Sequence, residues 1–192
     1  MSQSAPIQRP DPMFTLKTDS SMTGWGAFLV ETEWKTQGLW TEEERQQHIN
    51  YLELLAVFLA LKSLLTDIYT VHIRVMSDNM TGVSCLNKQG SRSEILNDMT
   101  RDIWQWCEQR GIWLSAAHIP GVENVEADRL SRELHTDTEW KLDSRLLQDA
   151  LTVLDIKPDI DLFASRVNAQ FRKYVAFLPD SGAHANDTFS CS

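Results

Sequence analysis

The chain has 192 residues, a mass of 22.0 kDa and a formal net charge of −9, from 18 basic and 27 acidic side chains. This length suits one domain of ordinary size with an appendage, and a composition of 42% hydrophobic and 23% charged residues excludes a wholly disordered or fibrous chain. The acidic balance argues against a non-specific nucleic-acid-binding protein, which usually has a basic face. It is compatible with an enzyme that meets phosphates through carboxylate-bound metal ions.

Other classes are excluded by what the sequence lacks. It contains no apolar run near the roughly 20 residues that a membrane-spanning helix needs, and its N-terminus lacks the apolar segment of a secretory signal. We therefore expect no membrane partner and a cytoplasmic or nuclear location. Cys85, Cys107 and Cys191 have no metal-ligand spacing and are expected to be reduced thiols.

The first part of the chain predicts a linker followed by an antiparallel meander. Residues 1–12 are polar and contain three prolines, which is typical of a linker. Apolar and polar residues alternate over 14–20, and this alternation predicts a strand. Two further short strands, 24–31 and 33–40, follow so closely that we expect the three to pair as neighbours.

The middle of the chain predicts helices that alternate with parallel strands. The segment 50–65 is apolar nearly all round, which predicts a buried helix. Strand 71–77 after it indicates a parallel crossover. A short helix over 81–87, a longer one over 93–110 and a strand over 112–119 are expected next, and Gly111 suits the end of the longer helix.

The last part predicts one more helix and an appendage. Residues 123–134 read as a helix after the break at Pro120 and Gly121. Further on, we expect a helix that opens at Asp143, a strand-like segment over 159–164 and a loop at the end. We therefore divide the chain into the linker 1–12, a domain over 13–135 and an extension over 136–192.

Four carboxylates stand at positions that suggest chemistry. Asp19 and Asp78 end two strands that can pair in parallel, Glu53 lies in the apolar helix and Asp128 lies in the helix after the last strand. Ligand sites gather at the carboxyl ends of parallel strands. Four converging carboxylates need a cation, because they cannot all stay ionised together. Taken singly, each has an ordinary explanation as a turn former, helix cap or surface residue.

With the residues around these four carboxylates, the sequence resembles the ribonuclease H domain of retroelement reverse transcriptases. The resemblance spans about residues 14 to 134, and its motifs occur in the right order. They are Thr18-Asp19-Ser20-Ser21 with Gly24-Trp25-Gly26, Asn50-Tyr51-Leu52-Glu53-Leu54-Leu55-Ala56, Ser77-Asp78-Asn79, and His118-Ile119-Pro120-Gly121 with Asn124 and Ala127-Asp128. The amino-acid sequence of these motifs is most similar to that of DIRS-type, tyrosine-recombinase retrotransposons.

The resemblance implies an α/β, ribonuclease H-like fold. Its five-stranded mixed sheet would have three antiparallel strands and two parallel additions, flanked by helices. The extension would form a small α/β unit. Its segment 161–166, with Asn168, also resembles the opening of phage-type adenine methyltransferase domains, but that resemblance stops before any catalytic motif.

The resemblance also implies a role for each site residue. Two Mg²⁺ ions, with Mn²⁺ as the possible substitute, would be held by Asp19, Glu53, Asp78 and Asp128. His118, on the loop before the last helix, would help protonate the leaving group. Asn50 would contact the RNA/DNA hybrid in its minor groove, although a helix N-cap explains Asn50 equally well. Three further residues complete the implied substrate site: Ser20, Asn79 and Asn124.

The implied function is metal-dependent hydrolysis of the RNA strand of RNA/DNA hybrids during reverse transcription. The resemblance implies two partners, the hybrid and the polymerase domain of the same polyprotein, because retroelement domains of this kind often rely on the polymerase to hold the substrate. Only four basic residues lie between Asp78 and His118, so we expect weak binding by the chain alone. We expect a monomer in isolation. The alternatives are a non-catalytic, partner-binding scaffold and a different nuclease on the same fold. Trp104, Trp106 and Trp113 suit either base stacking or core packing, and the helical spacing favours the core.

Overall fold

The computed structural model describes residues 11–133 and 140–186. Most of the predicted linker, the boundary near residue 135 and Cys191 lie outside these residues. The first elements in chain order are β1 (Phe14–Ser20), β2 (Gly24–Leu29), β3 (Trp34–Leu39), α1 (Glu42–Arg45), α2 (Ile49–Leu64), β4 (His72–Ser77), α3 (Met80–Lys88) and α4 (Glu94–Glu108). They are followed by β5 (Trp113–His118), the 3₁₀ turn η1 (Gly121–Glu123), α5 (Val125–Arg132), α6 (Ser144–Leu154), β6 (Ile160–Leu162), β7 (Lys173–Ala176) and β8 (Ala185–Asn186).

The main sheet is five-stranded and mixed, as the sequence predicts. Its strand order is β3-β2-β1-β4-β5. The hairpin partners β1, β2 and β3 run antiparallel, whereas β4 pairs in parallel with both β1 and β5. The expected parallel pairing of the first and fourth strands is therefore confirmed, and it places β1 and β4 side by side in the sheet.

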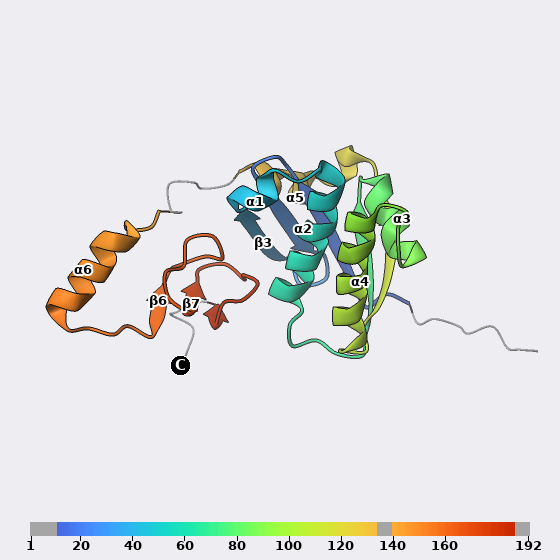
Figure 1. Cartoon of the computed structure of the whole chain (residues 1–192). Coiled ribbons are helices and arrows are strands. Elements are labelled where there is room, and N and C mark those ends of the chain that lie inside the picture. The colour runs from blue at the N-terminus through green and yellow to red at the C-terminus, as the bar shows by residue number, and fades with distance from the viewer. Residues whose placement is uncertain (1–10, 134–139, 187–192) are drawn as a thin grey trace, which may run out of the picture.

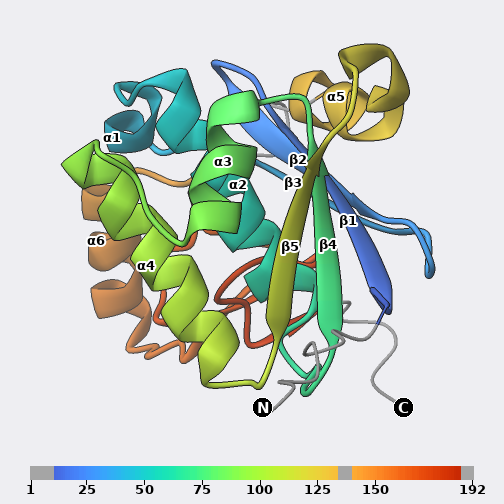
Figure 2. The same cartoon turned by 90° about the vertical axis from the view of Figure 1, so that its right-hand side faces the viewer.

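Helices cover both faces of this sheet, but unequally (Figure 2). The helices α2, α3 and α4 lie on one face, and α5 lies on the other face over β1 and β2. Helix α2 is buried on nearly all sides, because leucine, alanine and valine occupy most of its positions. Its side chains meet Leu16, Ile73 and Val75 of the sheet in the main hydrophobic core. The prediction of a buried helix is thus confirmed.

The helix expected over 123–134 is shorter in the structure. A 3₁₀ turn occupies Gly121–Glu123, and α5 begins only at Val125. The short helix α1 was not predicted. Its capping box explains it: Thr41 accepts a hydrogen bond from the Glu44 main chain, while the Glu44 carboxylate accepts one from the main chain of Thr41.

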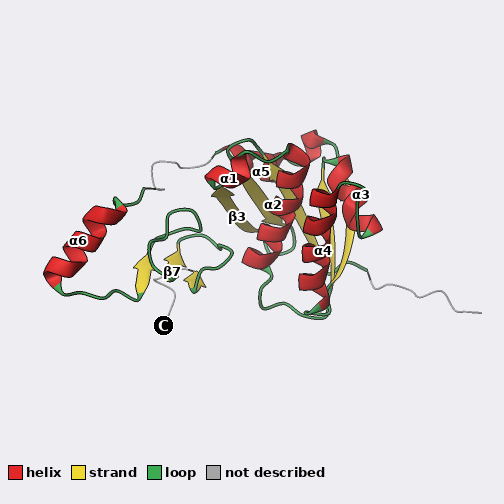
Figure 3. Ribbon diagram, in the orientation of Figure 1, coloured by secondary structure: helices red, strands yellow, loops and turns green. Residues whose placement is uncertain are grey.

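The C-terminal segment forms a second, smaller sheet, which Figure 3 shows apart from the first. Its order is β6-β7-β8, with all pairings parallel. The expected helix after Asp143 is confirmed as α6 (Figure 1). None of its residues is buried. The strands β7 and β8 were not predicted, because two to four residues carry too little alternation to recognise.

The segment is joined to the main domain by defined polar contacts. The Arg166 guanidinium forms an ion pair with Glu44 at 2.7 Å and donates to the carbonyl of Leu39. The Thr36 hydroxyl donates to the carbonyl of Pro179. Among the described helices, none has the length and apolarity to cross a membrane.

Four of the seven tryptophans lie in the main core or pack against it, whereas Trp34 and Trp140 are exposed. Trp25 and Trp40 are almost completely buried. Trp104 packs against the core, donates its indole N–H to the Leu86 carbonyl and meets Trp113 edge to face at 5.3 Å. Core packing is therefore confirmed for Trp104, and the same contact with the core is seen for Trp106.

Candidate active site

Two aspartates lie at the carboxyl ends of neighbouring parallel strands. Asp19 is the penultimate residue of β1, and Asp78 directly follows β4. Because β1 and β4 are parallel partners, both strands end at one edge of the sheet, where ligand sites form. Glu53, near the start of α2, reaches the same point. One carboxylate oxygen from each of these three residues lies within 4.8 Å of the other two.

Burial makes this cluster of carboxylates unfavourable in its ionised form. Burial is the largest cause that raises the pKa of Asp19 to about 6, and the charges of Asp78 and Asp128 add to the shift. Burial likewise raises the pKa of Glu53 to about 8, and the charge of Asp19 adds to it. Ser20, which neighbours Glu53, opposes that shift without cancelling it. The negative charge at this point therefore requires a proton or a cation.

The donor set fits a hard divalent cation. Glu53 is 6% exposed, and its Oε2 atom has no hydrogen-bond partner among the described residues. A buried carboxylate oxygen without a partner is costly, and coordination of an ion removes that cost. Carboxylate oxygens are the ligands that Mg²⁺ and Ca²⁺ prefer. Asp19, Glu53 and Asp78 are thus the residues that would hold the ion.

Asp128 does not belong to this group of three. Its carboxylate lies on the exposed side of α5, where it accepts a hydrogen bond from Nε of Arg132 at 2.7 Å. It is still close enough to raise the pKa of Asp19. The structure therefore brings together three of the four predicted metal ligands and pairs the fourth with an arginine.

His118 occupies the same edge of the sheet, but not the predicted loop. It is the exposed last residue of β5 and pairs in register with Ser77, the residue before Asp78. The strand extends this far because the Ile119 N–H still donates to the Ser77 carbonyl. The loop that follows lies against the cluster, because a Cβ atom at Gly121 would be 3.1 Å from Oδ2 of Asp78.

Asn50 and Asn79 contact each other beside the carboxylates. Nδ2 of Asn79 donates to Oδ1 of Asn50 at 3.0 Å, and Oδ1 of Asn79 caps α3 by accepting from Gly82. The N-cap interpretation of Asn50 is wrong. His48 is the N-cap of α2, and its Nδ1 atom accepts the N–H of Asn50. An imidazole can accept through an unprotonated ring nitrogen, although His is not among the favoured N-cap residues.

The two other predicted substrate contacts are buried. Ser20 ends β1 and is 7% exposed. Asn124 is completely buried, and its Nδ2 atom donates to the Thr18 carbonyl at 2.9 Å. This position of Asn124 ties the start of α5 to β1 and favours a structural role over contact with a substrate.

Sequence reasoning missed Ser131, the residue that contacts the cluster from α5. Its hydroxyl is fully buried and donates to Oδ2 of Asp19 at 2.6 Å. The available signal was its place three residues after Asp128, which sets the two residues on one side of a helix. A serine at such a spacing is too common to be noticed without the fold.

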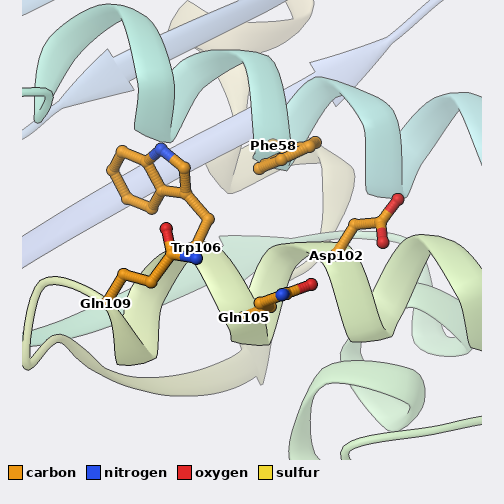
Figure 4. A pocket seen from close by; sticks show the side chains of 5 residues that line it. All are labelled: Phe58, Asp102, Gln105, Trp106 and Gln109. Carbon is orange, nitrogen blue, oxygen red and sulfur yellow. The ribbon is translucent and has the colours of Figure 1, made fainter.

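A shallow pocket lies elsewhere, between α2 and α4 (Figure 4). Phe58 and Trp106 flank it, and the guanidinium of Arg110 lies 4.1 Å from the ring of Trp106. Its remaining lining residues are Asp102, Gln105 and Gln109. It contains none of the predicted site residues.

The fold of the main domain is shown by comparison with solved structures. No protein-family model matches the chain, and no curated protein matches it either. Among solved structures, it is similar to RNase H1 from the halophilic archaeon Halobacterium salinarum NRC-1, with a TM-score of 0.53 and 17% identity over 65% of this chain and 98% of that chain. It is also similar to LC11-RNase H1 in complex with an RNA/DNA hybrid, with a TM-score of 0.55 and 18% identity over 65% of this chain and 97% of that chain. The five-stranded domain therefore has the ribonuclease H-like fold.

Proposed function

We propose that this protein is a divalent-metal-dependent endonuclease that hydrolyses the RNA strand of RNA/DNA hybrids. The observation that carries this proposal is the convergence of Asp19, Glu53 and Asp78 at the carboxyl edge of a ribonuclease H-like sheet. The similar LC11-RNase H1 structure is described as a complex with an RNA/DNA hybrid, which supports the proposed class of substrate.

The roles proposed for the residues follow from their positions. Asp19, Glu53 and Asp78 bind the metal, for which we propose Mg²⁺ with Mn²⁺ as a substitute. The bound metal would activate water and stabilise the leaving oxygen. Asp128 joins a second ion only if its carboxylate leaves Arg132, and an exposed pair of this kind is weak enough to open. His118 is exposed beside Asp78, where it can donate a proton to the leaving group.

We further propose that the chain acts in the reverse transcription of a DIRS-type retroelement, beside a polymerase domain of the same polyprotein. The motif wording from Asp19 to Asp128 supports this origin. The small number of basic residues supports the need for a partner. Only four lie between Asp78 and His118, and one of them, Arg110, stacks on Trp106. A polymerase domain would supply further basic side chains that bind the phosphates of the hybrid.

The test is a cleavage assay on a hybrid labelled in its RNA strand, with Mg²⁺, with Mn²⁺ and with chelator. We expect metal-dependent cleavage that Asp78→Asn reduces at least about a hundredfold, because removal of one ligand weakens the metal site. The variant should stay folded, since it removes a repelling charge. Circular dichroism checks the fold.

Two outcomes would contradict the proposal. Full activity of Asp78→Asn would show that the metal site is elsewhere. A folded parent chain that stays inactive with both metals, even after addition of the polymerase domain, would favour the non-catalytic scaffold.

A further inference from the structure

The last turn of α5 is bonded directly to the carboxylate cluster. The Ser131 hydroxyl lies 2.6 Å from Oδ2 of Asp19 and 2.9 Å from the main-chain carbonyl of Asp128. A hydroxyl group has a single hydrogen to donate. The carboxylate is the stronger acceptor and the closer one, so the hydrogen bond to Asp19 dominates.

Ser131 is itself held firmly against the sheet. The Ser21 hydroxyl donates to the Ser131 carbonyl at 2.8 Å. On the other side, α5 lies so close to β2 that a Cβ atom at Gly26 would be 2.6 Å from the Ser131 nitrogen. Both contacts come from the hairpin of β1 and β2, the same hairpin that carries Asp19. The Ser131 hydroxyl is therefore a fixed donor relative to the Asp19 carboxylate.

This arrangement has a consequence for an ion. A carboxylate that could rotate freely among its neighbours would turn away from Glu53 and Asp78, because like charges repel. A fixed donor on one oxygen holds the group in a single orientation and leaves the second oxygen available. Hydrogen bonds of this kind to metal-binding groups set both their orientation and their affinity.

We propose that Ser131 is a positioning residue that orients Asp19 for the metal ion. This inference rests on the proposed metal-dependent function. Helix α5 then acts on the metal site through Ser131 and not through Asp128. It provides none of the three grouped carboxylates but orients one of them, Asp19.

The test is isothermal titration calorimetry of the full chain with Mn²⁺, together with thermal unfolding with and without the ion. Ser131→Ala should bind Mn²⁺ about 10- to 100-fold more weakly than the parent chain. Ser131→Cys should behave similarly, because it keeps nearly the same volume but offers only a weak donor. If Ser131→Ala fails to fold, Ser131→Cys still decides the matter.

Ser63→Ala is the matched control. Ser63 is also a buried helical serine, but its hydroxyl donates to the Leu59 carbonyl of its own helix. It lies ten residues beyond Glu53 along α2, roughly 15 Å along the axis. Because this hydroxyl bonds only within its own helix, its loss should leave the Mn²⁺ affinity and the rise in melting temperature on Mn²⁺ binding unchanged.

The outcomes separate the two proposals. If the parent chain and Ser131→Cys bind Mn²⁺ equally well while Asp78→Asn binds it poorly, the role of Ser131 is refuted and the metal site stands. If the parent chain shows neither binding heat nor a rise in melting temperature, the metal site fails, and the role of Ser131 fails with it.

Discussion

Glu53 carries the clearest conflict between stability and function at the scale of single residues. Its side chain lies in the apolar start of α2, 6% exposed, with Asp19 as its neighbour. A glutamine or leucine at this position would avoid an ionised group in the core. A carboxylate can be accommodated at this position if a bound cation compensates for its buried negative charge.

The raised pKa of Glu53 predicts how stability depends on pH in chelator. The folded chain holds the proton up to about pH 8, whereas the unfolded chain releases it near pH 4.5. The unfolded state therefore binds fewer protons within this window, and the free energy of unfolding should fall by several kcal/mol as the pH rises through it. Below pH 4.5 this contribution to stability is fully present.

Urea unfolding between pH 5 and pH 8.5 in chelator measures this effect. Glu53→Gln should be more stable than the parent chain at pH 8 and should show a shallower pH dependence. Equal slopes for the two proteins would mean that Glu53 is not held protonated by its surroundings.

At the scale of elements, the site depends on how closely α5 approaches β2. Gly26 makes this approach possible. A Cβ atom at this position would lie 2.5 Å from Cβ of Leu130 and 2.7 Å from the carbonyl oxygen of Ala127. Two of the three nearest atoms are main chain, so the helix itself must move to make room. Since Ser131 lies on this helix, the packing of an element decides the orientation of a single carboxylate.

Gly26→Ala should therefore destabilise the chain by about 1–3 kcal/mol, the range for an overpacked core position. Gly82→Ala is the control, because the nearest atom to its Cβ would be 3.6 Å away. In the helix α3, that change should be neutral or stabilising by up to about 1 kcal/mol. Thermal unfolding of both variants checks this contrast, and a stability loss of similar size in both would contradict the role of close packing.

At the scale of the whole molecule, one of the contacts that join the C-terminal segment to the main domain is made with α1. Arg166 meets both carboxylate oxygens of Glu44, at 2.7 and 3.0 Å. The same carboxylate closes the capping box of α1, and both partners of the ion pair are largely buried. Bidentate pairs of this kind have a defined geometry and are stronger than exposed pairs.

Arg166→Ala should loosen the C-terminal segment without affecting the metal site. Limited proteolysis should cut within residues 140–186 several times faster than in the parent chain, because the lost pair leaves Glu44 partly buried and without its cation. Mn²⁺ affinity should stay the same. Arg172→Ala, an exposed arginine in the same segment, should not change the rate. Equal rates for both variants would show that Arg166 does not hold the segment.

The net charge of −9 leads us to expect that binding of a hybrid depends strongly on salt concentration. Contact with a hybrid should depend on a few phosphates and on the metal, so binding should weaken at least about tenfold between about 50 and about 200 mM salt. Fluorescence anisotropy with Ca²⁺, which occupies oxygen-rich sites, measures this without cleavage. A flat salt response would count against binding led by phosphates.

Much of the architecture follows from local patterns in the sequence. Alternation defined β1 within its observed bounds, and the apolar composition of 50–65 defined α2. The strand ends at Asp19 and Asp78 could be recognised because a polar residue followed each apolar run. Short elements escaped prediction, because α1, β7 and β8 depend on caps and partner strands rather than on periodicity.

The sequence by itself determined the succession of the strands β1 to β5 and the helices α2 to α6, the buried nature of α2 and the carboxylates at the ends of β1 and β4. These features are local, since each depends on residues close together in the chain. Only the tertiary structure decided that Ser131 bonds to Asp19, 112 positions away, that Asp128 pairs with Arg132 and that Asn124 is buried against Thr18. Such contacts depend on the distance between packed elements. This distance is set by residues such as Gly26, which has no Cβ atom and so lets α5 approach β2 closely. No local pattern in the sequence records it.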